Sequence, residues 1–293
     1  MIYDVRQTTT YTYASGVSAA RHVLRLLPIP RPGQRVVAAA LDIRPAPVER
    51  RDGTDFFGNR VTHIALDHAH DRLEVEMLAR IIVDPPEPLE PGATPAWESV
   101  RDDLAASRDL GPAAPLHFLF PSRHVTLDPE IRDWVEASFA PGRPVLDAAL
   151  ALTQRFRQEF SYDTAATNVA TTAPMSFALR RGVCQDFAHI MIAGLRGLGI
   201  PAAYVSGYLR TVPPPGQKRL EGADAMHAWV LVWCGEAHGW RGLDPTNGIA
   251  AGVDHIQLAV GRDYADVAPV DGVVLAAGAH QVAVSVDVVG RLF

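Results

Sequence analysis

Residues 182–201 read GVCQDFAHIMIAGLRGLGIP, and this stretch decides the fold of the chain. Apolar side chains recur after Cys184 at spacings of three and four, which is the pattern of a buried helix face, so a helix is predicted from Cys184 to Leu198. Gly199 supplies a left-handed stop, and Pro201 keeps the helix from continuing. The predicted helix therefore begins at a cysteine.

The segments on both sides of this helix complete an α+β core. Helical spacing also marks residues 145–160, and a second helical start follows at Pro174. After the cysteine helix come three strand candidates, at residues 202–210, 227–234 and 240–243. This order predicts a core in which the helix that bears the cysteine packs on an antiparallel sheet.

The first part of the chain is of a different kind. Residues 1–84 hold short runs of alternating apolar and polar side chains separated by turn signals, which predicts a β-sandwich-like domain. Prolines at four of the eight positions 85–92 exclude regular structure there and indicate a boundary. The predicted organisation is a β-rich N-terminal domain over residues 1–84, a linker with short helices over 85–144, and a catalytic core with C-terminal strands over 145–293.

Composition argues against several classes of protein. The formal net charge is −6, from 33 acidic and 27 basic residues, and no block of Lys or Arg occurs, so a nucleic-acid partner is not expected. No apolar run approaches the roughly 18 residues of a membrane span, and the first residues lack the pattern of a signal peptide. With two cysteines in the chain, Cys184 and Cys234, a disulfide scaffold is not expected, and the expected location is the reducing cytoplasm.

Cys184 is the candidate nucleophile. The first turn of a helix presents unpaired N–H groups and the positive end of the helix dipole, which favour a thiolate over a thiol. Gly182 lets the backbone turn tightly into the helix. Taken alone, however, a single cysteine is more often a small buried apolar residue than a nucleophile.

His227 and Asp244 complete a candidate triad. His227 opens one strand candidate, and Asp244 ends the next, where Pro245 stops the strand from extending. A short turn joins the two strands, so the imidazole and the carboxylate can lie side by side. A cysteine, a histidine and a carboxylate in this order fit the nucleophile, base and orienting group of acyl-transfer enzymes.

The same residues resemble a known family, the bacterial transglutaminase-like proteins, which have a papain-like cysteine-enzyme core. The resemblance lies in Gly182–His189, Gly199–Tyr208, Met226–Val230, Leu243–Thr246 and Gly261–Val267, and in an N-terminal domain with the run Asp55–Asn59. It covers nearly the whole chain. The resemblance implies that Cys184 is the nucleophile, that His227 is the general base and acid, and that Asp244 orients the imidazole.

One departure from the wider superfamily bears on the reaction. Animal transglutaminases carry a Trp directly after the cysteine and another well upstream, whereas here Gln185 follows Cys184 and no Trp lies between Trp134 and Trp229. We therefore expect a hydrolytic enzyme, a peptidase or amidase that cleaves peptide or side-chain amides through a thioester. Amine transfer to a glutamine side chain remains the alternative, as does a non-catalytic binding scaffold. The sequence leaves the oligomeric state open.

Further groups near the triad have weaker signals. The backbone N–H of Cys184 is expected to contribute to an oxyanion hole, and Gln185, Tyr162 and Thr171 are weak side-chain candidates for the same role. Although Cys184, His189 and His227 are ligand types that zinc accepts, no CxxC or HExxH spacing occurs, and no metal or cofactor is expected. The run Pro213–Gly216 is expected to form a loop that could flank the cleft.

Overall fold

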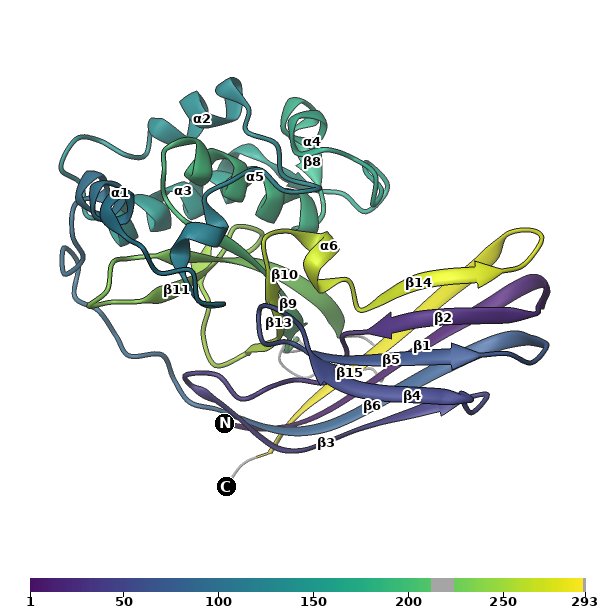
Figure 1. Ribbon diagram of the computed structural model, residues 1–293. Coiled ribbons are helices and arrows are strands. Elements are labelled where there is room, and N and C mark those ends of the chain that lie inside the picture. The colour runs from purple at the N-terminus through teal and green to yellow at the C-terminus, as the bar shows by residue number, and fades with distance from the viewer. Residues whose placement is uncertain (212–223, 292–293) are drawn as a thin grey trace, which may run out of the picture.

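The computed structural model describes residues 1–211 and 224–291 and has the predicted α+β architecture (Figure 1). A β-sandwich forms one part, and a five-stranded sheet covered on one face by helices forms the other. The predicted loop at Pro213–Gly216 lies outside the described residues. None of the helices within the described ranges is long and apolar enough to cross a membrane.

The sandwich consists of two four-stranded sheets, ordered β15-β1-β6-β3 and β14-β2-β5-β4. Along β6 every second side chain from Leu73 to Val83 is buried, which is the period of a strand with one face in the core. The strand bounds are β1 Ile2–Val17, β2 Ala19–Leu24, β3 Gln34–Arg44, β4 Glu49–Thr54, β5 Arg60–Leu66, β6 His70–Val83, β14 Val270–Leu275 and β15 His280–Arg291.

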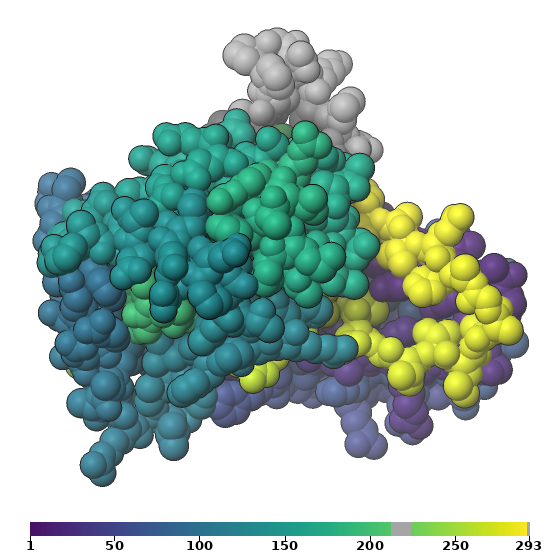
Figure 2. Space-filling view, turned by 90° about the horizontal axis from the view of Figure 1, so that it is seen from above, coloured from purple at the N-terminus to yellow at the C-terminus, as the bar shows by residue number. Residues whose placement is uncertain are grey.

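The last two strands belong to the sandwich rather than to the catalytic core, where the sequence placed them. β15 pairs antiparallel with β1 from Ile2↔Arg291 to Tyr13↔His280, and β14 pairs with β2. In Figure 2 this C-terminal hairpin lies beside the helical layer. Because such pairing joins segments some 270 positions apart, local patterning could identify the strands but not their partners.

The helices cover one face of the core sheet (Figure 1). No regular structure occurs at the proline-rich residues 85–92, as predicted. The helices are α1 Trp97–Ala106, a 3₁₀ turn at Pro115–Phe118, α2 Pro129–Glu136, α3 Val145–Glu159, α4 Ala173–Leu179, α5 Cys184–Gly197 and α6 Tyr264–Val267. The predicted helices at 145–160, from Pro174 and from Cys184 are thus confirmed.

The core sheet is ordered β12-β11-β10-β9-β13 and supports α5. Helix α5 is buried on almost all sides because the sheet lies under one face and α2 packs on another, so closely that a Cβ on Gly194 would lie 2.2 Å from Val135 Cγ2. The strand bounds are β9 Ala202–Leu209, β10 Ala225–Trp233, β11 Trp240–Asp244, β12 Ile249–Ala250 and β13 His255–Gly261, and a short parallel pair is made by β7 Ser161–Tyr162 and β8 Arg181–Gly182.

Two side-chain amides of the sandwich bind the outer edge of β13, an edge strand of the core sheet. Gln34 donates to the Gln257 carbonyl at 2.7 Å and accepts the Gln257 N–H at 2.8 Å. Asn59 makes the same pair of bonds with Val260, at 2.7 and 2.8 Å. Each amide thus imitates a strand neighbour, which satisfies backbone groups that an edge strand otherwise leaves open.

Candidate active site

The start of α5 places Cys184 where the sequence predicted it. The first intrahelical hydrogen bond runs from the Phe187 N–H to the Val183 carbonyl, so the N–H of Cys184 precedes the hydrogen-bonded part of the helix. Asp186 reaches back and accepts the Val183 N–H at 2.8 Å, and its Oδ2 also accepts from Thr167 Oγ1 at 2.6 Å. Cys184 itself is partly exposed, as a nucleophile must be.

The backbone before Cys184 leaves no room for a side chain at Gly182. A Cβ built there would lie 2.5 Å from Asp186 Oδ2, so the carboxylate could no longer reach back to the start of the helix. Gly182 is also held by β7, because it pairs with Tyr162. Glycine at this position therefore lets the carboxylate fix the turn that presents the cysteine.

His227, on β10, lies between the cysteine and a carboxylate. Its Nε2 is 2.8 Å from Asp244 Oδ2, which leaves Nδ1 to face Cys184. Burial opposes a charge on the ring, but the hydrogen bonds and charges of Asp244 and Cys184 outweigh it and raise the pKa of His227 to about 10. Trp229 stacks beside the ring, with centroids 6.3 Å apart and planes 27° apart. At neutral pH the ring is held as an imidazolium.

Asp244 is fully buried and accepts five hydrogen bonds. Oδ1 accepts the N–H groups of Thr246 and Asn247 at 3.0 and 3.2 Å. Oδ2 accepts from Asn247 Nδ2 at 2.6 Å, in addition to His227 and a second histidine, His255. Burial alone would raise the pKa of this carboxyl, but its donors, above all His227 and His255, hold the pKa well below its usual range. Asp244 is therefore a permanent anion.

Sequence reasoning missed His255 and Asn247. His255 opens β13, which follows Asp244 after a turn and the two-residue strand β12, and its Nε2 lies 3.1 Å from Asp244 Oδ2. Only the register of β13 against β9 brings the ring to the carboxylate, and no local motif predicts that register. The turn after Asp244 carried a usable signal, since an Asp side chain commonly accepts the backbone N–H two residues on, as Asp244 does from Thr246.

Three of these groups could in principle bind a metal ion. His227, Asp244 and His255 offer ligand atoms within 4.8 Å of one another. A metal on His255 Nε2 would force that ring's proton onto Nδ1, yet Nδ1 already accepts the Gly252 N–H at 3.1 Å. The cluster thus fits a network of hydrogen bonds better than a metal site.

The three side chains predicted as weak oxyanion donors differ in position. Tyr162 is exposed as a whole, although its hydroxyl is partly buried. This partial burial is the larger cause, and the nearby charge of Cys184 the smaller cause, of a raised pKa for Tyr162. Thr171 Oγ1 instead accepts the Asn168 N–H at 3.0 Å within its own loop. Gln185 is partly buried on the first turn of α5. Of the three, Tyr162 is thus the one whose hydroxyl is influenced by the charge of Cys184.

His189 has a structural role. Its Nε2 accepts the Tyr264 N–H at the start of α6, at 3.2 Å, and its ring stacks on His124 with centroids 5.7 Å apart. Burial lowers the pKa of His189, with contributions of opposite sign from Asp263 and His124. Cys234 is buried as predicted, and burial raises its pKa to about 12. Neither residue resembles a reactive group.

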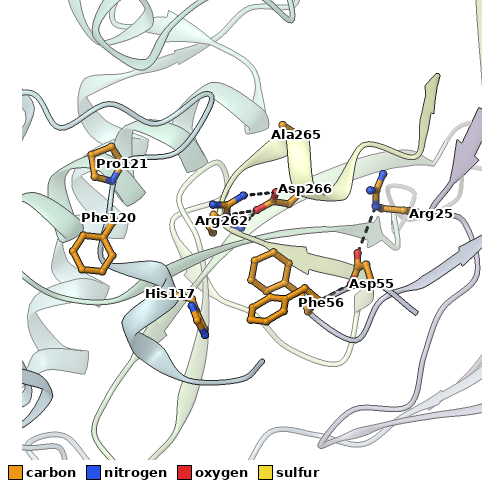
Figure 3. A pocket seen from close by; sticks show the side chains of 10 residues that line it. Arg25, Asp55, Phe56, His117, Phe120, Pro121, Arg262, Ala265 and Asp266 are labelled. Carbon is orange, nitrogen blue, oxygen red and sulfur yellow. Dashed lines mark hydrogen bonds and ion pairs between the residues drawn. The ribbon is translucent and has the colours of Figure 1, made fainter. Parts of the chain in front are cut away.

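A cavity of about 460 Å³ lies at the junction of the two parts, away from these residues (Figure 3). The aromatic rings of Phe56 and Phe120 line it. Its charged groups largely pair with each other, as Arg262 does with Asp266 at 2.8 Å. No triad residue lines this cavity.

Comparisons with known proteins match both parts of the chain. Residues 3–82 match the bacterial transglutaminase-like N-terminal region, and residues 132–245 match the transglutaminase-like superfamily. Uncharacterised proteins of Mycobacterium tuberculosis and Mycobacterium bovis are 36% identical over 98% of this chain and 92% of their own length. A protein-glutamine gamma-glutamyltransferase of Pseudomonas aeruginosa is 38% identical, over 34% of this chain and 15% of its own.

Among solved structures, a Cytophaga hutchinsonii protein, provisionally described as a cysteine protease, has the same fold. It aligns with a TM-score of 0.73 over 100% of this chain and 92% of its own, at 21% identity.

Proposed function

The chain belongs to the transglutaminase-like superfamily, whose members are cysteine-type enzymes. We propose that it catalyses acyl transfer from amides through Cys184, His227 and Asp244. The observation that carries the proposal is the position of His227, whose ring bonds Asp244 through Nε2 and faces Cys184 through Nδ1. An imidazolium held between a carboxylate and a thiol is the arrangement that activates a cysteine nucleophile.

The first half of the reaction forms a thioester. The Cys184 thiolate attacks the amide carbonyl carbon, and the new oxyanion is bound by the unpaired N–H at the start of α5, with Tyr162 as a candidate side-chain donor. His227 then gives its Nδ1 proton to the leaving nitrogen, the C–N bond breaks, and an amine or ammonia departs. Asp244 keeps the ring oriented and compensates its charge throughout.

The second half uses the same imidazole as a base. Neutral His227 takes a proton from water, the resulting hydroxide attacks the thioester carbonyl, and the C–S bond breaks to release a carboxylic acid and restore the thiolate–imidazolium pair. We propose water as the acceptor because no Trp follows Cys184 or lies between Trp134 and Trp229. The similarity to the Pseudomonas glutamyltransferase supports an amine acceptor as the second candidate.

Peptide cleavage and amine incorporation, measured on the same preparations, test these proposals. Wild type, Cys184→Ala and Cys234→Ala are compared in a broad peptide library and in the transfer of a labelled amine to glutamine-containing protein. Cys234 is the matched control because its thiol is buried with a raised pKa. Cleavage that needs Cys184 but not Cys234 supports the hydrolase, and label that follows the same pattern supports the transferase. If wild type shows no activity above the Cys184→Ala background in either assay, the proposal of acyl transfer is overturned.

A further inference from the structure

A second imidazole binds the same carboxylate oxygen as the catalytic histidine. His255 Nε2 lies 3.1 Å from Asp244 Oδ2, and His227 Nε2 lies 2.8 Å from that atom. The two ring centroids are 6.2 Å apart. The His255 side chain is only 4% exposed.

The turn before β13 fixes which nitrogen of His255 carries the proton. Nδ1 accepts the Gly252 N–H at 3.1 Å, and the His255 N–H in turn donates to the Gly252 carbonyl at 3.0 Å. With Nδ1 occupied as an acceptor, the proton of the neutral ring lies on Nε2, which points at Asp244. His255 is therefore a fixed donor to the triad carboxylate.

A shared oxygen holds each of its donors less tightly. Each hydrogen bond that Oδ2 accepts withdraws electron density, which weakens the carboxylate as a partner for the imidazolium. Among the described residues, Asp244 of β11 and Cys184 of α5 favour the charge on His227 against the effect of burial. His255 of β13 binds the same oxygen of Asp244 as His227 does. An imidazolium that is held too tightly is a poor acid toward a leaving nitrogen.

We propose that His255 is a positioning residue of this acyl-transfer site: its Nε2–H fixes Asp244 Oδ2 and competes with His227 for it, which lets His227 release its proton to the leaving group. This inference rests on the proposed function for its role in turnover. The competition itself is a property of the resting protein and is measurable without any substrate.

The test compares His255→Gln, which keeps a donor nitrogen near the position of Nε2, with His255→Leu, which removes it. The His227 ring is titrated by NMR in each protein, and its signal is assigned from the His227→Ala variant. In His255→Leu we expect the pKa of His227 to rise by about half a unit or more, and in His255→Gln to stay near the wild-type value. An unchanged or lower pKa in His255→Leu would overturn the proposal.

A measurement on the wild-type protein covers the case in which neither variant folds. The ¹⁵N shifts of His255 report its tautomer directly, and we expect Nε2–H across the neutral range. A proton on Nδ1 would overturn the proposal, because Nε2 could then no longer donate to Asp244. Failure of the peptide and amine assays would instead remove the acyl-transfer function and leave both NMR results standing.

Discussion

Two histidines of the catalytic core, the largely buried His227 and the fully buried His189, have surroundings that drive their pKa values in opposite directions. At the triad, a carboxylate and a thiol outweigh burial and raise the pKa of His227 to about 10. At the start of α6, His189 accepts a backbone N–H, so a proton on that nitrogen would break the bond, and burial lowers the pKa. Partners rather than depth decide whether a buried imidazole is an acid–base group or a cap.

The largest expected effect is the difference in activity and Cys184 reactivity between the His227→Ala and His189→Ala variants. His227→Ala should lower acyl transfer by about a thousandfold or more and abolish the preferential alkylation of Cys184 by iodoacetamide near pH 7, because the imidazolium is lost. His189→Ala should leave that alkylation rate near wild type and lower the free energy of unfolding by about 1–3 kcal/mol, since the Tyr264 N–H loses its acceptor.

Peptide mass spectrometry measures the alkylation rate of Cys184, with Cys234 as the internal reference. Urea unfolding measures the free energy of unfolding. Equal loss of Cys184 reactivity in both variants would contradict the division between a catalytic and a structural histidine. Reactivity at Cys184 that ignores both substitutions would show that the triad is not assembled in solution.

The second prediction concerns stability in alkali. The folded-state pKa of His227, about 10, exceeds its ordinary value of 6.5, so its contribution to stability is fully present below pH 6.5 and is lost as pH rises through about 10. The wild-type advantage over His227→Ala should therefore shrink across this window, by on the order of 2–4 kcal/mol. Urea unfolding of both proteins from pH 6 to 10.5 measures it, and a constant difference would argue against the ion pair.

A smaller effect is expected at the glycine before the nucleophile. Gly182→Ala puts a Cβ against Asp186, so we expect a loss of about 1–3 kcal/mol in stability and a slower alkylation of Cys184, by roughly tenfold. Gly16→Ala is the matched control, because nothing lies within 4 Å of a Cβ there and the backbone is not left-handed. If the two variants unfold and alkylate alike, the close approach at Gly182 does not position the cysteine.

The sequence predicted the parts of this site that local pattern encodes. Cys184 stands at the start of a buried helix, and His227 and Asp244 belong to consecutive strands joined by a short turn, so their order and spacing, with the family resemblance, pointed to them. His255 reaches the same carboxylate only through the pairing of β13 with β9. Chain-wide pairing likewise decides that β14 and β15 complete the sandwich. Spacing and periodicity along the chain could not predict these contacts, because they depend on how distant strands pair.

The amides of Gln34 and Asn59 on the edge of β13 have a consequence for how far the two parts can be separated. A catalytic fragment cut free of residues 1–84 would expose the Gln257 and Val260 backbone groups, and an open strand edge recruits strands from other molecules. Such a fragment would tend to aggregate rather than to act as a smaller enzyme. The two parts therefore depend on one another for stability, because each amide satisfies backbone groups that the other part exposes.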